Sequence, residues 1–267
     1  MNLGRQGVIS RWIPDLARRA KRWIFPPACG VCDEILSHHR QSQMPFLCEN
    51  CESRLTPMGA EACRVCGQSY GDGSVLNLAM ATFRCSNCAD RELAVDFAIS
   101  AYRSSGEARE LMHAYKYGKQ IHLARLWGVL LQRVWEDERL REVPGWHLVP
   151  VPLHRKRLRE RGFNQAAEIA TEFRRHSPNG SHLVETACLV RTKATVRQAQ
   201  LDRKERLRNL SDVFALRAKA DSFEEGFGIL IVDDVMTTAT TVSECARILR
   251  DSGFEDQPIA AISVLRG

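Results

Sequence analysis

Long apolar runs are absent from this chain of 267 residues. A helix that crosses a membrane needs about 20 consecutive apolar residues, and no run reaches that length, so we predict no transmembrane segment. Residues 1–22 also lack the continuous apolar core of a secretory signal, because charges interrupt them at Arg5, Arg11, Asp15 and Arg18. We therefore expect a cytoplasmic protein, in which cysteine thiols stay reduced.

Aromatic residues are also scarce, at 7% of the chain, and they form no regular series among the basic residues. Proteins that hold single-stranded nucleic acid without sequence preference stack the bases on aromatic side chains along a basic groove. The composition therefore argues against nucleic-acid binding as the sole function. The net charge of +6 is modest, but the clustering of the basic residues still favours anionic partners.

Residues 1–25 combine apolar residues with several arginines, and Pro26 ends the segment. The pattern predicts a short amphipathic helix. A basic amphipathic helix either packs on its own protein or lies on a membrane surface. Packing on the protein is favoured, and the membrane alternative stays open.

Cysteine, in contrast, is abundant, with ten residues, of which eight form four C-x-x-C pairs. The pairs are Cys29/Cys32, Cys48/Cys51, Cys63/Cys66 and Cys85/Cys88. Gaps of 15 residues between the first two pairs and 18 between the last two fall in the range of zinc ribbons. Each pair offers two thiolates to one tetrahedral ion, so two pairs complete a closed site.

We therefore predict two structural zinc sites. Crossed assignment of the pairs to the two sites stays open, and so does a redox role, although four pairs in series argue against the latter. Cys188 and Cys245 fall outside this spacing scheme and are expected in the core.

Four consecutive aliphatic residues, Ile229–Val232, lead directly into Asp233 and Asp234. Such a run predicts a short strand buried on both faces, as in a parallel sheet. The carboxylates then lie at its carboxyl end, where open α/β sheets bind ligands. Ionised carboxylates only accept hydrogen bonds, so a pair of them suits a vicinal diol or a metal ion.

Four threonines fall within the next short segment, Thr237–Thr241, before an amphipathic run begins a helix at Val242. Hydroxyl groups and free backbone N–H groups at a helix N-terminus suit a phosphate monoester. A phosphate site and a diol site at opposite ends of one loop describe a ribose 5-phosphate. The alternative is an ordinary turn in which Asp234 and one threonine cap the helix, but capping needs only one such residue.

A basic segment, residues 154–164, follows a strand predicted over residues 146–152, so we expect it at the same edge of the sheet as Asp233. Against the single acid Glu160, it carries Arg155, Lys156, Arg157, Arg159 and Arg161. Guanidinium groups bind phosphate bidentately, and Gly162 lets the backbone approach a ligand closely. The alternative is a solvent-exposed basic face.

The other predicted elements alternate along the chain. They are strands over residues 95–102, 183–189 and 259–265, and helices over residues 107–135 and 164–173. The first helix is expected to break near Tyr117 and Gly118. Strands that alternate with helices indicate an α/β sheet with right-handed crossovers.

The stretch ILIVDDVMTTATT at residues 229–241 resembles the motif with which type I phosphoribosyltransferases bind 5-phosphoribosyl 1-pyrophosphate (PRPP). With the cysteine pairs, it makes nearly the whole chain similar to the ComF family, which is known from bacterial DNA uptake and resembles amidophosphoribosyltransferases. The other matching segments are residues 25–32, 63–67, 108–124, 149–166 and 191–214.

The resemblance implies an α/β protein with the type I phosphoribosyltransferase fold, a mainly parallel sheet flanked by helices, and a small zinc-ribbon module. It divides the chain into an amphipathic segment at residues 1–25, a double zinc ribbon at 26–92 and a phosphoribosyltransferase domain at 93–267.

The resemblance also assigns roles to residues. Asp233 and Asp234 are the catalytic residues, which hold the ribose hydroxyls. The 5-phosphate is cradled by Thr237, Thr238, Ala239, Thr240 and Thr241. The pyrophosphate is bound by Arg155, Arg159, Arg161 and Gly162. The family usually has glycine where this chain has Ala239, and a Cβ there would crowd the phosphate or resist a positive φ.

Two other segments receive roles in the same way. Residues 191–209 correspond to a flexible hood that closes over PRPP, with candidate contacts from Gln198, Arg203 and Arg206; from Leu201 onward an ordinary amphipathic helix fits equally well. Lys116 and Tyr117 would reach an anion or stack a base. His113 is expected to be a packed or capping residue rather than a base.

The function implied is Mg²⁺-dependent transfer of the 5-phosphoribosyl group from PRPP to a nitrogen acceptor, linked to DNA uptake. No residue stands out as a general base, and no motif identifies the acceptor. The alternatives are a non-catalytic nucleic-acid-binding accessory factor for DNA uptake and a PRPP sensor without catalysis. Candidate partners are PRPP, single-stranded DNA and proteins of the competence machinery.

Overall fold

The computed structural model describes residues 27–59, 62–70, 85–177, 183–185, 187–193, 213–217 and 223–267. The chain forms two compact units, one up to Ser53 and one from Arg54 to Gly267. The first two cysteine pairs lie in the first unit, and the other two lie in the same unit as the sheet. The domain boundaries expected from the sequence stay a prediction.

The first unit contains two short helices, α2 (His38–Gln43) and α3 (Glu49–Ser53). Ser37 caps α2, because its hydroxyl accepts a hydrogen bond from the N–H of Arg40 at 3.1 Å. The Arg40 side chain donates to the Leu47 carbonyl at 2.9 Å and forms an ion pair with Glu52 of α3. The buried residues of this first unit are three cysteines, Leu36, Pro45 and Leu47, and a core of this size needs a further stabilising element such as a metal ion.

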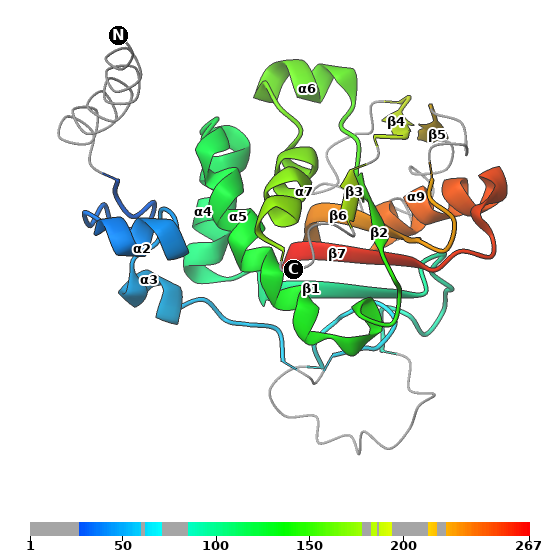
Figure 1. The fold of residues 1–267 in the computed structure, drawn as a ribbon, viewed down its shortest axis with the longest axis horizontal. Coiled ribbons are helices and arrows are strands. Elements are labelled where there is room, and N and C mark those ends of the chain that lie inside the picture. The colour runs from blue at the N-terminus through cyan, green and yellow to red at the C-terminus, as the bar shows by residue number, and fades with distance from the viewer. Residues whose placement is uncertain are drawn as a thin grey trace, which may run out of the picture. The chain divides into compact units, whose positions relative to one another are not determined.

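The second unit is built on a parallel sheet of five strands in the order β1-β7-β6-β2-β3 (Figure 1). The strands are β1 (Phe97–Arg103), β2 (Trp146–Pro150), β3 (Leu183–Glu185), β6 (Gly228–Met236) and β7 (Ile259–Arg266). A separate antiparallel pair is formed by β4 (Leu189–Arg191) and β5 (Phe214–Leu216). The single strand expected over residues 183–189 is therefore wrong: its two ends join different sheets.

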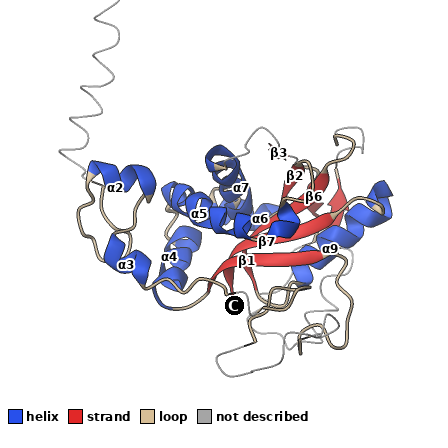
Figure 2. Cartoon of the chain, turned by 60° about the horizontal axis from the view of Figure 1, so that its bottom comes forward, coloured by secondary structure: helices blue, strands red, loops and turns tan. Residues whose placement is uncertain are grey.

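The helices cover both faces of the parallel sheet (Figures 1 and 2). The helices of this unit are α4 (Gly106–Tyr117), α5 (Ala124–Leu131), α6 (Arg155–Arg161), α7 (Gln165–His176) and α9 (Thr240–Leu249), of which α6 has no buried residue. Short helical turns add η1 (Ile121–Leu123), η2 (Gln132–Glu136), η3 (Glu138–Leu140) and the π-helical η7 (Arg250–Phe254). The break expected near Tyr117 and Gly118 is confirmed, since α4 ends at Tyr117.

Strand β6 lies at the centre of the core, as its unbroken aliphatic run predicts. All four residues from Ile229 to Val232 are fully buried, at 0% exposure. Ile229 and Ile231 pack in one cluster with the apolar face of α9, which includes Val242 and Leu249. Because successive side chains of a strand alternate, Leu230 and Val232 face the side covered by α5 and α7.

Helices α5 and α7 approach each other closely at Gly128. A Cβ added to this glycine would lie 2.4 Å from the Cβ of Glu172, so any larger residue would force the two helices apart. The architecture is the predicted α/β class, a parallel sheet with helices on both faces joined to cysteine clusters, and it is consistent with the type I phosphoribosyltransferase fold.

Candidate functional site

The acidic pair lies within β6 rather than after it. The strand continues to Met236, so Asp233 and Asp234 occupy its last half, and Asp233 pairs in register with Ser263 of β7. Both aspartates are partly exposed, in contrast to the fully buried residues before them. They therefore reach the carboxyl-end edge of the sheet, as expected, but on extended backbone.

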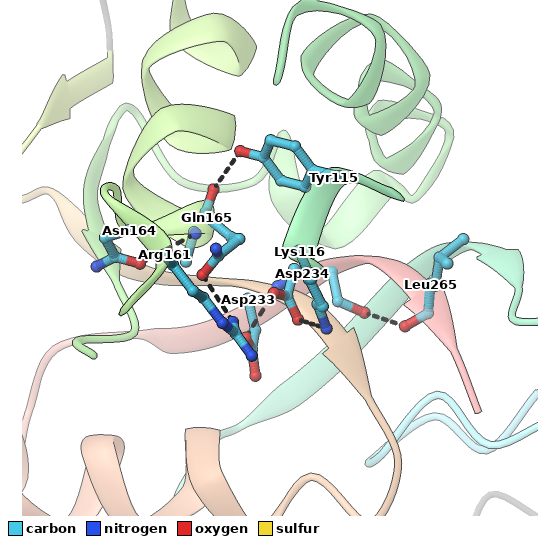
Figure 3. A network of polar contacts seen from close by, with 10 residues as sticks. Tyr115, Lys116, Arg161, Asn164, Gln165, Asp233, Asp234 and Leu265 are labelled. Carbon is cyan, nitrogen blue, oxygen red and sulfur yellow. Dashed lines mark hydrogen bonds and ion pairs between the residues drawn. The ribbon is translucent and has the colours of Figure 1, made fainter. Parts of the chain in front are cut away.

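Lys116, from the last turn of α4, forms an ion pair with this acidic pair. Its Nζ lies 2.7 Å from Asp234 Oδ1, and the two side chains are 18% and 13% exposed (Figure 3). The N–H of Asp234 in turn donates to Asp233 Oδ1 at 2.9 Å. The structure thus joins Lys116, which was expected to reach an anion or stack a base, to the carboxylates.

The two aspartates differ in electrostatic environment. Burial, and after it the charge of Asp234, raises the pKa of Asp233 to about 7. Lys116, the N–H of Asp234 and Arg191 act in the opposite direction without cancelling this shift. Asp233 therefore changes its charge near neutral pH.

The basic segment after β2 forms a short helix, α6. His154 caps it by accepting from the N–H of Lys156 at 3.2 Å. Gly162 ends it with φ 86°, and no atom lies within 4 Å of where its Cβ would be. The left-handed backbone favours glycine here, and the expected close approach of the backbone to a ligand stays a prediction.

Arg161, at the end of α6, is directed toward the acidic pair (Figure 3). Its Nη1 donates to Gln165 Oε1 at 2.9 Å, and its guanidinium carbon lies 5.1 Å from the centroid of the exposed Tyr117 ring. Arg155 and Arg159 are exposed on the same helix. Within the part of the chain that the structure describes, Arg161 is the pyrophosphate candidate with contacts to the candidate site.

Gln165 is a member of the site that the sequence analysis missed. It opens α7 next to the capping Asn164, its carbonyl accepts from the hydroxyl of Tyr115 at 3.1 Å, and its side chain is 1% exposed. Within the described part of the chain, its Nε2 has no hydrogen-bond partner. A buried donor of this kind is suited to a ligand, but no motif marks a glutamine at this position.

Arg191 of β4 is a second residue whose place the sequence did not reveal. Burial lowers the pKa of its guanidinium, Arg157 lowers it further, and the charge of Asp233 raises it. Arg191 is therefore close enough to Asp233 to affect its charge. The β4–β5 pair brings it there, and that pairing has no signature in the sequence.

The loop from β6 to α9 brings the threonines together. Thr238 Oγ1 and Thr240 Oγ1 lie 2.8 Å apart, Thr237 is exposed, and Thr240 and Thr241 form the first turn of α9. Ala239, between them, adopts φ 57° and ψ 13°, the left-handed conformation that glycine favours.

The methyl group of Ala239 does not crowd the open side of this loop. The residue is only 3% exposed and belongs to the core cluster that includes Val242 and Cys245. Of the two difficulties expected at this position, the positive φ is present, whereas the Cβ packs inward.

The eight paired cysteines form two tetrads. In each tetrad, the four sulfur atoms all lie within 4.8 Å of one another. The first tetrad is Cys29, Cys32, Cys48 and Cys51, and the second is Cys63, Cys66, Cys85 and Cys88. Consecutive pairs therefore share a site, which settles the question of crossed assignment. Cys188 and Cys245 are fully buried, as expected.

The tetrads fit a zinc ion. A tetrahedral ion with Zn–S bonds of about 2.3 Å separates its sulfurs by about 3.8 Å, and the structure has 3.7 Å between Cys32 and Cys48 and 3.4 Å between Cys66 and Cys85. Burial raises the pKa of Cys63, but hydrogen bonds from backbone N–H groups, led by that of Cys66, lower it to about 6. These are two structural zinc-binding sites.

Comparisons with known proteins agree with this arrangement. Residues 20–89 match the family model of the double zinc ribbon domain. The chain is 29% identical to competence protein F of Haemophilus influenzae over 177 residues, which cover 64% of this chain and 74% of the relative. It is 24% identical to competence protein ComFC of Bacillus subtilis over 243 residues, or 84% and 89% of the two chains. Together these matches support a ComF family protein.

Another relative is the DNA utilization protein YhgH of Salmonella typhi, which is 28% identical over 234 residues, 85% of this chain and 92% of the relative. The hood candidates Gln198, Arg203 and Arg206, and the amphipathic segment 1–25, lie outside the described residues. Among the helices that are described, none combines the length and the hydropathy needed to span a membrane.

Proposed function

We propose that this ComF chain binds PRPP with Mg²⁺ and transfers the 5-phosphoribosyl group to a nitrogen acceptor. The observation that carries the proposal is the arrangement at the end of β6. A carboxylate pair with its own lysine lies at one end of the loop, and two threonine hydroxyls at a helix N-terminus lie at the other. A diol and a phosphate monoester need these groups.

The reaction consists of one substitution at the anomeric carbon. A bond forms to the acceptor nitrogen while the bond to the pyrophosphate oxygen breaks, the pyrophosphate leaves with the electron pair, and the nitrogen loses a proton. Asp233 and Asp234 accept hydrogen bonds from the ribose hydroxyls and stabilise positive charge on the sugar. Lys116 holds Asp234 in the orientation seen in Figure 3.

The leaving group would be bound by basic side chains at the same edge. Arg161 has the position for this role, and the Nε2 of Gln165 adds a buried donor beside it. Mg²⁺, bound with PRPP, would neutralise the pyrophosphate charge. No general base is assigned, and positioning supplies the catalysis.

A role in DNA uptake is the second part of the proposal. Relatives are named competence proteins and DNA utilization proteins. Helix α6 presents Arg155, Lys156 and Arg159 to solvent near the exposed Tyr117. Basic side chains with an aromatic ring can hold a single strand, so DNA and competence proteins remain candidate partners. The zinc thiolates suit a reducing cytoplasm.

Calorimetric titration with PRPP and Mg²⁺ tests the proposal. Wild type is expected to bind, and Asp233→Asn/Asp234→Asn is expected to lose at least about tenfold in affinity, since charge-assisted hydrogen bonds are lost. Glu255→Gln/Asp256→Asn is the matched control, because it removes two adjacent exposed acids elsewhere. Absence of binding to wild type would refute the proposal and direct the search to single-stranded DNA and protein partners.

A further inference from the structure

The second zinc tetrad is joined to the threonine loop by one side chain, that of Arg91. The residue follows the ligand Cys88 by three positions. Its Nη1 donates to Thr240 Oγ1 at 2.9 Å, and its Nη2 donates to the carbonyl of Thr238. Arg91 thus contacts the residues on both sides of Ala239.

The same guanidinium is held on the cysteine side by Asn87, which lies inside the Cys85–Cys88 pair. Arg91 Nε donates to the Asn87 carbonyl at 2.8 Å, and Nη2 donates to Asn87 Oδ1 at 2.9 Å. Asn87 Nδ2 also donates to the Thr238 carbonyl at 3.3 Å. The tight turn that presents two zinc ligands therefore also fixes the orientation of Arg91.

Further contacts hold the tetrad to this unit. The N–H of Ala94 donates to Ser243 Oγ of α9 at 3.0 Å. Arg266, at the end of β7, donates to Gln68 Oε1 at 3.0 Å and lies 3.6 Å from the sulfur of Cys66. The segment after Cys88 is thus attached to α9, and the Cys63–Cys66 pair with the nearby Gln68 is attached to the end of β7.

The loop needs an external support of this kind. An L-residue is disfavoured in the left-handed conformation, yet Ala239 adopts it at φ 57°. Ala239 is also the N-cap residue of α9, and its side chain makes no capping hydrogen bond. The contacts from Arg91 to Thr238 and Thr240 fix the flanking residues in the arrangement that leaves the N-terminal N–H groups of α9 available to an anion.

We propose that Arg91 is a positioning residue through which zinc at the second tetrad holds the loop Thr237–Thr241 in its phosphate-binding form. The proposal rests on the proposed function for the identity of the anion, the 5-phosphate of a ribose. Zinc at this site then has a second role besides stabilising the ribbon: binding of the phosphate depends on it.

Binding of the two halves of PRPP separates positioning from general stability. The probes are ribose 5-phosphate and inorganic pyrophosphate, each titrated calorimetrically into the full chain. Arg91→Ala is expected to weaken ribose 5-phosphate binding by about tenfold or more and to change pyrophosphate binding less than about twofold. Arg91→Lys keeps the charge but loses the planar set of guanidinium donors, so this variant is also expected to bind ribose 5-phosphate more weakly than wild type.

Arg250→Ala is the matched control. Arg250 also fixes the segment after the tetrad, by donating to the Ala94 carbonyl at 2.8 Å and to Asp96 at 2.8 Å, but its contacts are away from the threonines. It is expected to keep the affinity for both probes. Equal losses for both probes in Arg91→Ala, or the same loss in Arg250→Ala, would overturn the positioning role.

Amide hydrogen exchange of residues 237–243 tests the coupling without any ligand. Exchange is expected to become faster in Arg91→Ala, in Asn87→Ala, and in Cys85→Ser/Cys88→Ser, and to stay unchanged in Arg250→Ala. Unchanged exchange in Arg91→Ala would refute the coupling. If wild type binds neither ribose 5-phosphate nor PRPP, the proposed function fails, while the exchange result still supports or refutes the link from zinc to loop.

Discussion

Lys116 Nζ lies 2.7 Å from Asp234 Oδ1, although the two residues are 118 positions apart in the chain. The contact joins the C-terminal turn of α4 to the last half of β6. It provides one cation for two adjacent carboxylates in a partly buried place. Because the pKa of Asp233 is raised to about 7 even with this cation present, Lys116 limits the electrostatic cost of ionising the pair.

Replacement of Lys116 by methionine is therefore expected to destabilise the protein more at pH 8 than at pH 5. Removing one partner of a buried ion pair costs about 3–5 kcal/mol, and partial exposure reduces the expected loss to about 1–2 kcal/mol. Urea unfolding at pH 5 and pH 8 measures this loss in the free energy of unfolding. Arg109→Met, which removes an exposed cation from the same helix, is the control, and a loss equal to that of Lys116→Met would contradict the role of the ion pair.

The raised pKa of Asp233 predicts how stability depends on pH. Its folded value is about 7, whereas an unfolded aspartate has a pKa of about 3.9. Between these values the folded state binds more protons, so this residue lowers the free energy of unfolding as pH rises from about 4 to about 7. This loss of stability is fully present above the folded-state pKa of Asp233.

Asp233→Asn removes this penalty. The variant is expected to be more stable than wild type by about 1–3 kcal/mol at pH 8, with a difference that shrinks toward pH 5. Unfolding in urea at pH 5, 6, 7 and 8 measures the trend, with the exposed Asp256→Asn as control. A constant difference across this range would show that Asp233 does not titrate there.

Substitutions of Ala239 test the free-energy cost of its left-handed backbone conformation. In Ala239→Gly, relief of the backbone strain at positive φ stabilises the protein by about 1–2 kcal/mol. Loss of the buried methyl group costs about 0.8 kcal/mol, and the greater conformational freedom of the unfolded chain costs about 0.4–1 kcal/mol. We expect stability within about 1 kcal/mol of wild type. Since the methyl packs in the core, affinity for PRPP should change less than about threefold.

Ala239→Val is expected to destabilise the protein much more than Ala239→Gly does, because a β-branched residue resists a positive φ. The expected loss of stability is about 2–3 kcal/mol or more, measured by thermal unfolding. Ala246→Val overpacks the same cluster from within α9 and serves as the control. A smaller loss for Ala239→Val than for Ala246→Val would show that the backbone conformation contributes little.

Zinc stoichiometry distinguishes the ligand cysteines from the others. The purified protein is expected to hold two zinc ions, one for each tetrad. Cys85→Ser/Cys88→Ser should hold one and unfold at a lower temperature, because metal binding contributes to folding. Cys188→Ala, which changes a fully buried cysteine outside the tetrads, should keep both ions. Elemental analysis gives the counts, and retention of two ions by the double variant would contradict the assignment.

The sequence alone determined the parts of this protein that depend on local pattern. Four C-x-x-C pairs at ribbon spacing predicted the zinc sites, and the aliphatic run Ile229–Val232 predicted the buried central strand. The acidic pair and the threonine loop followed directly along the chain, so their adjacency was visible. Each of these features involves residues that are close in sequence, or a spacing that is itself the signal.

Only the tertiary structure decided which distant residues meet. The sheet order β1-β7-β6-β2-β3 places strands side by side that are far apart in the chain, and this order brings Lys116 to Asp234. The contact of Arg91 with the threonine loop spans almost 150 residues, and the end of β6 at Met236 is set by its pairing with β7. No periodicity records such contacts, because they arise from the packing of whole elements and not from the preferences of neighbouring residues.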